Sequence, residues 1–559
     1  MLITHKIGNN WQGIPPQVID DDLYYYARIT DVAKGHPFLG NPYFLEYSGA
    51  MAPAFFLPDW INAAPLLLGL PLIPTIILNF LLWSVIFTIL IYLIARQFDL
   101  SPPASAIAAI VSFLETYWLM MRPVAMQVIF PSFLLFLLAL ILWLKQKDNR
   151  SRQIFLIIAS ALTFYLYAYL WQIVCIILGL LFIYFLFQKQ IKTARQLFVI
   201  FIGTIVLSIP AIIYTVKQIQ APFYWQTIAR IGLISTHLPA YYAYQYGRWV
   251  IIVLAAYFLV WWVEVRHHEV RPRPEIIALI FSGLGLLIMS VSNLLTGKEL
   301  ETALHTGRFI TLWVPMFFTI LIFRWWKEKT LFSRSNWQGS ALFIKVCICI
   351  LILLTAGFLV SNLNRSLPWS QISRTDFKPY QEYAAPFDWL NQNASSSNVI
   401  WANENISTYL PVMTRDYVFW DHLGTLHLMP SREVEDRFLL SWIGTSTSAA
   451  DLIGDYRSYD GAGPVWKYTD LYYKNRLGCD FKLSCAPDKT LAQWIGIGFI
   501  KDLEARQAIL KSNLKENLKK YSVSYAVADK SLDEDKYFDT LPFLKQVWHN
   551  QRFVIYKVK

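Results

Sequence analysis

The stretch that decides the fold class is Gln172-Ile-Val-Cys-Ile-Ile-Leu-Gly-Leu-Leu-Phe-Ile-Tyr-Phe-Leu-Phe187, followed directly by Gln188-Lys-Gln-Ile-Lys-Thr-Ala-Arg195. Its first part is almost wholly apolar and approaches the length that crosses a bilayer, roughly 17 to 25 residues. Its second part is polar and basic. Similar apolar runs recur between Ile61 and Val360. The sequence therefore predicts a polytopic α-helical membrane protein.

The composition also sets the chain apart from soluble proteins. Of its 559 residues, 55% are hydrophobic and 16% are charged, whereas an ordinary soluble domain carries about 25% charged residues. The net charge is +11, but most basic residues of the apolar half lie in short loops. This distribution is typical of a membrane topology signal and not of a nucleic-acid-binding face. No nucleic acid partner is therefore predicted.

About ten transmembrane helices are predicted, and they divide the chain into three segments. Residues 1–60 form a first outer loop, residues 61–361 form the transmembrane domain, and residues 362–559 form a soluble domain. The predicted spans cover residues 61–95, 103–121, 129–144, 153–170, 172–187, 197–215, 248–264, 275–293, 309–323 and 340–361.

Basic residues mark alternate connections between the spans and so predict the topology. They are Arg96, a group within 145–152, a group within 189–195, a group within 266–273 and a group within 324–334. By the positive-inside rule these connections are cytoplasmic. The first segment, the link 122–128, the loops 217–247 and 294–308, and the soluble domain then lie outside. We expect a multi-pass protein of a bacterial-type plasma membrane.

The soluble domain is predicted to be a mixed α/β fold. Apolar, β-prone runs occur at 398–402, 417–420, 521–527 and 553–558, with helical stretches such as 504–520 between some of them. Cys479 and Cys485 lie close together in an irregular segment. Because the predicted location is oxidising, we expect them to form a disulfide.

The densest functional signal is Asp20-Asp-Asp-Leu-Tyr-Tyr-Tyr-Ala-Arg-Ile29 in the first outer loop. Three adjacent carboxylates repel one another, so they require solvent, cations or a metal, and one pKa can rise into the range of a general base. The alternative is structural, because aspartate at the start of a helix satisfies exposed amides and complements the helix dipole.

The spelling Asp22-Leu-Tyr-Tyr-Tyr-Ala-Arg28, with His36-Pro37 after it, resembles the GT-C glycosyltransferase superfamily, and most of all oligosaccharyltransferase catalytic subunits and their bacterial relatives. The resemblance implies that Asp22, with Asp21 as second candidate, orients or deprotonates the acceptor nucleophile. It leaves open a divalent cation, Mg²⁺ or Mn²⁺, held beside Asp22. It further implies a polyprenyl-phosphate-linked sugar as donor, membrane lipid as surroundings, and a glycan, lipid or protein as acceptor.

The chain also departs from the oligosaccharyltransferase pattern. The short link Arg122-Pro-Val-Ala-Met-Gln127 holds no second acidic motif, and Trp420-Asp-His-Leu-Gly424 lies too far from the last span to match the family's Trp-Trp-Asp signature. These departures favour transfer of a monosaccharide from polyprenyl phosphate over peptide glycosylation.

A cationic group lies in the late outer loop Thr296-Gly-Lys-Glu-Leu-Glu-Thr-Ala-Leu-His-Thr-Gly-Arg-Phe309. Arginine can grip a phosphate with two hydrogen bonds and stabilise the charge that develops on a leaving group. Arg308, with His305 and Lys298, is therefore the predicted donor-phosphate site, a role that the superfamily resemblance also implies. The alternative is an interfacial anchor, because basic side chains at helix ends often reach to the membrane surface.

Three further residues are accessory candidates. Glu46 and His36 lie in the first outer loop, and Glu115 lies within a predicted span. An ionisable residue in a span costs roughly 2.5 to 3.5 kcal/mol on insertion scales, so Glu115 should have a partner. Arg122 is the nearest cation in sequence, and a structural pair is one interpretation; a second acid in the catalytic cavity is the other.

Two other functions stay open from the sequence. One is a transporter or lipid flippase with an outer sensor domain, although the spans carry few charges and no clear internal repeat. The other is a non-catalytic scaffold that binds glycans. The aromatic-rich loop 220–246 fits an interfacial belt, and it also fits a lid over an acceptor.

Overall fold

The computed structural model describes residues 10–18, 21–268, 273–332, 357, 360, 377–395, 397–443, 471, 474–479, 481–483, 485–486, 488–489 and 491–559. The chain divides into two compact units. Unit 1 contains residues 1–75, 214–235 and 371–559, and unit 2 contains residues 76–213 and 236–370. The predicted first loop and soluble domain therefore belong to the same unit.

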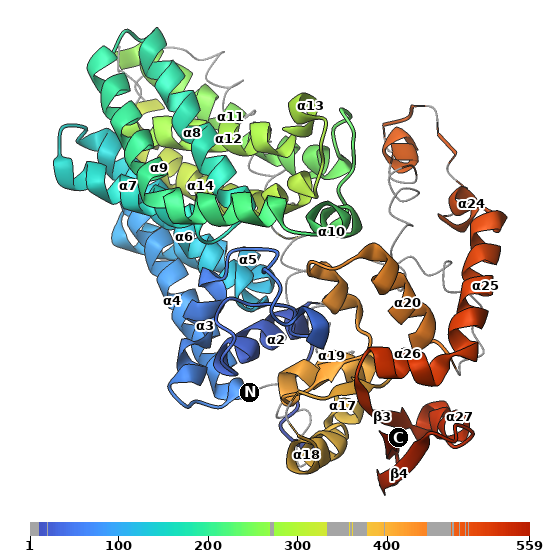
Figure 1. Ribbon diagram of the computed structural model, residues 1–559. Helices are drawn as coiled ribbons and strands as arrows, with labels where there is room; N and C mark the ends of the chain where they lie inside the picture. The colour runs from blue at the N-terminus through green and yellow to red at the C-terminus, as the bar shows by residue number, and fades with distance from the viewer. Residues whose placement is uncertain are drawn as a thin grey trace. The chain divides into compact units, whose positions relative to one another are not determined.

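Unit 2 is helical throughout its described part (Figure 1). Its helices are α4 (Leu72–Gln97), α5 (Pro102–Met121), α6 (Ala125–Lys145), α7 (Arg150–Phe164), α8 (Ala168–Phe187), α9 (Ile191–Gln220), α11 (Tyr241–His268), α12 (Pro274–Ser290), α13 (Asn293–Thr296) and α14 (Thr302–Phe332). The first residues of α4 and the last of α9 belong to unit 1.

Six of the described helices are long and apolar enough to cross a membrane: α4, α5, α6, α8, α9 and the segment Thr302–Arg324 of α14. Helix α12 is apolar but shorter. In the most apolar segments of α6 and α14, 89% and 78% of the residues are buried. In those of α4 and α9, only 22% and 28% of the residues are buried. Helices α6 and α14 thus form the core of the unit, and α4 and α9 expose apolar faces that suit lipid. The number of about ten spans stays a prediction, because 340–361 lies almost wholly outside the described residues.

The first predicted span, 61–95, is wrong as a single helix. The structure has α3 (Leu57–Leu67), a short turn, and then α4 from Leu72. Gly69 adopts the left-handed conformation with φ +90°, which favours glycine, and its N–H donates to the Leu66 carbonyl. Pro71 follows and lacks the N–H that a continuing helix would need. The apolar run hid this break because both helices are apolar.

Unit 1 contains a five-stranded sheet with the order β2-β1-β3-β5-β4. Strands β1 (Val399–Trp401), β2 (Tyr417–Val418) and β3 (Val523–Asp529) are parallel, while β5 (Phe553–Val558) is antiparallel to β3 and to β4 (Leu544–His549). Ile400 pairs with Val418 on one side and Tyr525 on the other. The mixed α/β fold is confirmed, and with it the predicted fold class of a polytopic helical protein with such a C-terminal domain. Strand β4 was missed because its sequence is polar and its surface is largely exposed.

Helices surround this sheet in the C-terminal part of unit 1. They are α17 (Lys378–Gln381), α18 (Ala384–Asn393), α19 (Glu404–Met413), η3 (His422–Leu426), α20 (Ser431–Ser441), α24 (Leu491–Ile495), α25 (Ile497–Ser512), α26 (Leu514–Lys520), η5 (Lys530–Leu532) and α27 (Glu534–Phe538). From earlier in the chain, α2 (Asp22–Ala33), η2 (Leu45–Tyr47), α3 and α10 (Tyr224–Ile231) join the same unit.

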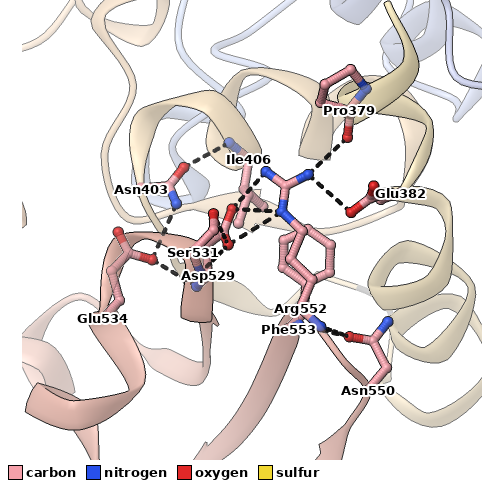
Figure 2. Close-up of polar contacts among 10 residues, drawn as sticks. All are labelled: Pro379, Glu382, Asn403, Ile406, Asp529, Ser531, Glu534, Asn550, Arg552 and Phe553. Atoms are coloured by element: carbon pink, nitrogen blue, oxygen red, sulfur yellow. Dashed lines mark hydrogen bonds and ion pairs between the residues drawn. The ribbon is translucent and has the colours of Figure 1, made fainter.

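Arg552 ties the end of β3 to the first helices of the C-terminal part, as Figure 2 shows. Its guanidinium donates to Asp529 Oδ2 over 2.8 Å and 3.0 Å, to Glu382 over 3.1 Å and to the Pro379 carbonyl over 3.0 Å. Such multiply bonded arginine–carboxylate pairs are stronger than ordinary surface ion pairs. We assign this network a role in the stability of the domain.

The predicted disulfide is present. Cys479 and Cys485 are bonded, with their Cα atoms 5.2 Å apart, within the usual range for a bridge.

Candidate functional site

The predicted donor-phosphate residues lie at the start of α14, where the structure surrounds them with residues from two other helices. We call this group the His305 cluster: Arg122, Tyr167, Tyr169, Glu301, His305 and Arg308. Arg122 directly follows α5, Tyr167 precedes the first residue of α8, and Tyr169 lies in its first turn. All six residues belong to unit 2.

Tyr167 is the central contact of the His305 cluster. Its hydroxyl accepts a hydrogen bond from Arg308 Nη1 over 3.3 Å and also contacts His305 Nδ1. Having accepted from Arg308, the hydroxyl has one proton to donate, so His305 Nδ1 is the acceptor. The imidazole proton then lies on Nε2, which faces Glu301 Oε2 at 3.3 Å. This assignment satisfies each group with neutral His305.

The His305 ring is also fixed by an aromatic contact. Tyr169 stacks on it with a centroid distance of 4.2 Å and an interplanar angle of 9°. Tyr169 is itself held because its hydroxyl donates to the Leu300 carbonyl. Stacking and two polar contacts thus leave His305 little freedom to move, so it serves to hold Tyr167, which in turn orients Arg308.

The His305 cluster carries an excess of positive charge. Burial and, to a smaller extent, the charge of Arg308 lower the pKa of Arg122, Tyr167 and Glu301 act in the opposite direction, and the net pKa is about 9. Burial acts to raise the pKa of Glu301, but His305, Arg308 and Arg122 lower it overall, so Glu301 is ionised at neutral pH. Two arginines against one carboxylate leave a net charge that attracts an anion.

The backbone of this region supports the cluster. Buried Glu299 accepts the Ala303 N–H over 3.1 Å and so caps the first turn of α14. Gly307 directly precedes Arg308, and a Cβ on it would overlap the Tyr246 ring. Only glycine therefore allows this close approach of α11 to α14. Lys298, the third predicted residue, is exposed on the preceding loop.

The acidic motif lies in unit 1. Asp22 is the first residue of α2, is 2% exposed, and its Oδ2 accepts the Val18 N–H over 2.9 Å. Burial raises the pKa of Tyr26, and the charge of Asp22 raises it further; Asp22 acts in the same direction on Tyr409 of α19. Asp21 is half-buried at the helix start, and Asp20 lies outside the described residues. The Asp22 carboxylate thus ties the segment before α2 to the first residue of the helix, and both interpretations of the acidic motif stay predictions.

The N-terminal segment before Asp22 is held by the C-terminal part of unit 1. The Gln381 side-chain amide accepts from the N–H groups of Gln12 (2.9 Å) and Ile14 (3.3 Å) and donates to the Ile14 carbonyl (3.0 Å). At the other end of α2, Lys34 and Thr30 donate to the Pro411 carbonyl near the end of α19. Such carbonyls lack a partner within their own helix. Helix α2 is therefore supported at both ends.

The accessory candidates have individual surroundings. Glu46 binds the fully buried Arg437 over 2.6 Å, within a network that also includes Glu433 at 3.2 Å, and His36 contacts Asp31 over 2.7 Å. Both arrangements fit structural roles. Glu115 is buried in α5. Arg122 interacts electrostatically with Arg308, Tyr167 and Glu301, and its pairing with Glu115 stays a prediction.

A divalent cation at Asp22 stays a prediction. Among the described residues, no three His, Cys, Asp or Glu side chains are grouped so that they could hold a metal ion. Asp20, a neighbour of the expected ligands, is not among those residues.

Sequence reasoning missed Arg122, Tyr167, Tyr169 and Glu301 as members of the site. Arg122 was taken as a partner of Glu115, and the two tyrosines were part of a predicted span. The sequence provided one signal for Arg122: it is a cation at the end of an apolar run, on the predicted outer face. Tyr167 and His305 are 138 residues apart in the sequence. Helical periodicity relates only residues within one helix, so it could not predict this contact.

No protein-family model matches the chain, and no curated protein matches it. Among solved structures, the chain is similar to ArnT from Cupriavidus metallidurans, both bound to undecaprenyl phosphate (14% identity, TM-score 0.44) and in the apo state (12% identity, TM-score 0.43). Each comparison covers 100% of this chain and 96% of the matched chain. At these identities, the residues of this chain carry the functional argument.

Proposed function

We propose that the protein is a GT-C-type glycosyltransferase that moves a sugar from polyprenyl phosphate to an acceptor at the extracytoplasmic membrane face. The observation that carries the proposal is that Arg308 donates to the Tyr167 hydroxyl at the amino end of α14, where Arg122 lies near enough to interact electrostatically with both Arg308 and Tyr167. Phosphate suits this arrangement because arginine binds it bidentately and a helix N-terminus favours an anion.

In the proposed reaction, an acceptor hydroxyl attacks the anomeric carbon of the sugar while the bond from that carbon to the phosphate oxygen breaks. The hydroxyl proton passes to the Asp22 carboxylate, and the bonding electron pair leaves with the phosphate. Arg308 and Arg122 stabilise the charge that develops on this leaving group. His305 and Tyr167 position Arg308. The acid and the cations belong to different units, so their action on one substrate is part of the proposal.

The test separates binding from chemistry. Purified protein in nanodiscs is titrated with a polyprenyl phosphate, and release of polyprenyl phosphate from a panel of polyprenyl-phosphate sugars is then followed in the presence of membrane extract. Arg308→Gln should weaken lipid binding, while Arg195→Gln, an exposed arginine outside the cluster, should not. Asp22→Asn should abolish release and leave lipid binding unchanged.

Two results would contradict the proposal. If Asp22→Asn releases polyprenyl phosphate at the unmodified rate, Asp22 is not the acid that activates the acceptor. If the protein binds the lipid and moves it across a liposome bilayer without releasing sugar, it is a flippase.

A further inference from the structure

Four buried polar side chains from separate parts of unit 1 meet around Arg28 of α2. They are Arg28 itself, Tyr43 from the loop before η2, Asp59 of α3, and His427, which directly follows η3. Arg28 is 7% exposed, His427 is 1% exposed, and Tyr43 and Asp59 are fully buried. We call these four residues the Arg28 cluster. The proposed transfer reaction uses none of them.

The Arg28 cluster is compact. Asp59 Oδ2 accepts from Arg28 Nη2 over 2.6 Å, and Arg28 Nη1 donates to the Tyr24 hydroxyl over 3.1 Å. The centroid of the His427 ring lies 5.8 Å from that of Tyr24 and 6.4 Å from that of Tyr43. The charge of Arg28 also acts on both Tyr43 and His427. All members of the cluster therefore lie within a short distance of the guanidinium.

The histidine of the cluster is neutral. Burial and, to a smaller extent, the charge of Arg28 lower the pKa of His427 to about 3, although the Gly40 backbone acts in the opposite direction. A neutral imidazole carries one N–H donor and one acceptor nitrogen. The charges of Arg28 and Asp59 offset each other, so the cluster as a whole has no net charge.

Each member of the cluster has a polar atom that the surrounding protein leaves unpaired. Within the described residues, Arg28 Nε, Asp59 Oδ1, the Tyr43 hydroxyl and both ring nitrogens of His427 have no hydrogen-bond partner of normal geometry. Such atoms are rare in protein interiors, because a buried donor or acceptor that leaves water needs a new partner. The unpaired atoms therefore indicate that a further hydrogen-bonding molecule belongs here.

We propose that the Arg28 cluster binds ordered water, which links α2 and α3 to the segment around His427. The unpaired atoms are of both kinds: Arg28 Nε only donates, the Asp59 carboxylate only accepts, and the Tyr43 hydroxyl does either. Water also donates and accepts, and a buried water molecule usually makes about three hydrogen bonds to the protein. Water thus matches the mixture of atoms that the cluster presents.

Two other kinds of ligand fit the cluster less well. An ion would leave a net buried charge, because Arg28 and Asp59 already neutralise each other, and a buried charge without a counter-ion is costly. A sugar would need an opening to the solvent, whereas no member of the cluster is more than 7% exposed.

The bound water adds a restraint to the middle of α2. Gln381 holds the segment before this helix, and Lys34 anchors its far end to the Pro411 carbonyl. The Arg28 cluster lies between these two contacts. Its water acts within the fold of unit 1, so the inference does not depend on the proposed transfer reaction.

The test is X-ray radiolysis of the full chain in nanodiscs. A short pulse forms hydroxyl radicals from bound and bulk water alike, and mass spectrometry then locates the oxidised side chains. Tyr43 reports on the Arg28 cluster, Phe387 of α18 is a buried aromatic residue outside it (1% exposed), and the partly exposed Tyr380 reports on bulk solvent. Mixing with heavy-oxygen water shortly before the pulse separates bound water, which exchanges slowly, from bulk water.

Tyr43 should be oxidised several-fold faster than Phe387, and it should take up heavy oxygen several-fold more slowly than Tyr380. Arg28→Met combined with Asp59→Leu should reduce the oxidation of Tyr43 to the level of Phe387. The matched control is Arg506→Met combined with Glu435→Leu, which removes a similarly buried ion pair elsewhere in unit 1 and should leave Tyr43 oxidation unchanged. Size-exclusion chromatography checks that each variant is folded.

Three results would overturn the proposal. Equal oxidation of Tyr43 and Phe387 in the unmodified protein would show that the cluster is dry. Uptake of heavy oxygen by Tyr43 as fast as by Tyr380 would show that the cluster opens to bulk solvent. Unchanged oxidation of Tyr43 in the folded variant without Arg28 and Asp59 would show that this pair does not hold the water.

Discussion

Replacing Arg122 by glutamine tests the proposed donor site most directly, because its charge is buried beside that of Arg308. The substitution keeps a polar side chain but removes the cation. A hydrogen bond to a charged group contributes about 1.5–3 kcal/mol, and every 1.4 kcal/mol changes an affinity about tenfold. We therefore expect Arg122→Gln to weaken donor binding by a factor of about 10 to 100.

The pKa of Arg122, about 9, adds a pH dependence to this prediction. An anionic ligand favours the protonated guanidinium, so the affinity for the donor should be constant below pH 9 and fall as the pH rises through that value. The fall should be no larger than the effect of Arg122→Gln itself. In the Arg122→Gln protein this fall in affinity near pH 9 should be absent.

Isothermal titration calorimetry of the full chain in nanodiscs, on either side of pH 9, measures both effects. A polyprenyl phosphodiester sugar is the suitable ligand, because its phosphate does not titrate in this range; a monoester loses its second proton near about pH 6. Arg195→Gln is the matched control. Unchanged affinity in Arg122→Gln, or a step near pH 9 that persists in it, would refute the placement of Arg122 in the donor site.

The other predictions concern contacts whose removal has distinct consequences. Asp59→Asn should lower the free energy of unfolding by about 3–5 kcal/mol, because it leaves Arg28 buried without its counter-ion; thermal unfolding measures this, and the pair Arg28→Met with Asp59→Leu should recover most of the loss. Gly307→Ala should weaken donor binding without preventing membrane insertion, because the new methyl group displaces the Tyr246 ring; unchanged binding would show that this close approach does not shape the site. Gln381→Ala removes three hydrogen bonds from the Gln381 side chain to the backbone of the N-terminal segment, each contributing about 0.5–1.5 kcal/mol. The segment before Asp22 should therefore become more sensitive to limited proteolysis; equal cleavage rates would show that Gln381 does not hold it.

The fold class could be predicted because lipid and soluble surroundings impose opposite compositions on the two halves of the chain. Hydrophobicity alone could not find the turn at Gly69, since α3 and α4 are both mainly apolar and the four residues 68–71 between them include only leucine, glycine and proline. It could not find β4 either, because that strand lies at the sheet edge, where polar residues such as Lys545 and Gln546 face solvent. Edge strands are commonly protected in this way.

The sequence could predict the members of the candidate site that are close together in the chain. It could not predict the members that only helix packing brings together. His305 and Arg308 are one turn apart on a helix, so their proximity follows from the sequence. Arg122 and Tyr167 reach them only because α5, α8 and α14 meet at one end of unit 2. The same limit applies to Glu46: as a carboxylate in the first outer loop it was an accessory candidate, and only the fold shows that it neutralises Arg437.

The position of Asp22 is determined by residues that precede and follow the membrane helices. Gln381 holds the segment before it, Tyr409 packs near its carboxylate, and the Pro411 carbonyl anchors the far end of α2. A carboxylate that serves as a base must keep a defined position, because a displacement of about 1 Å can cost a factor of about 100 in rate. The C-terminal part of unit 1 can therefore influence transfer without touching substrate, simply by holding α2. On this view, a loss of activity after a change in that domain is not evidence that the changed residue binds sugar, unless lipid binding and proteolytic sensitivity of the N-terminal segment are shown to be unaltered.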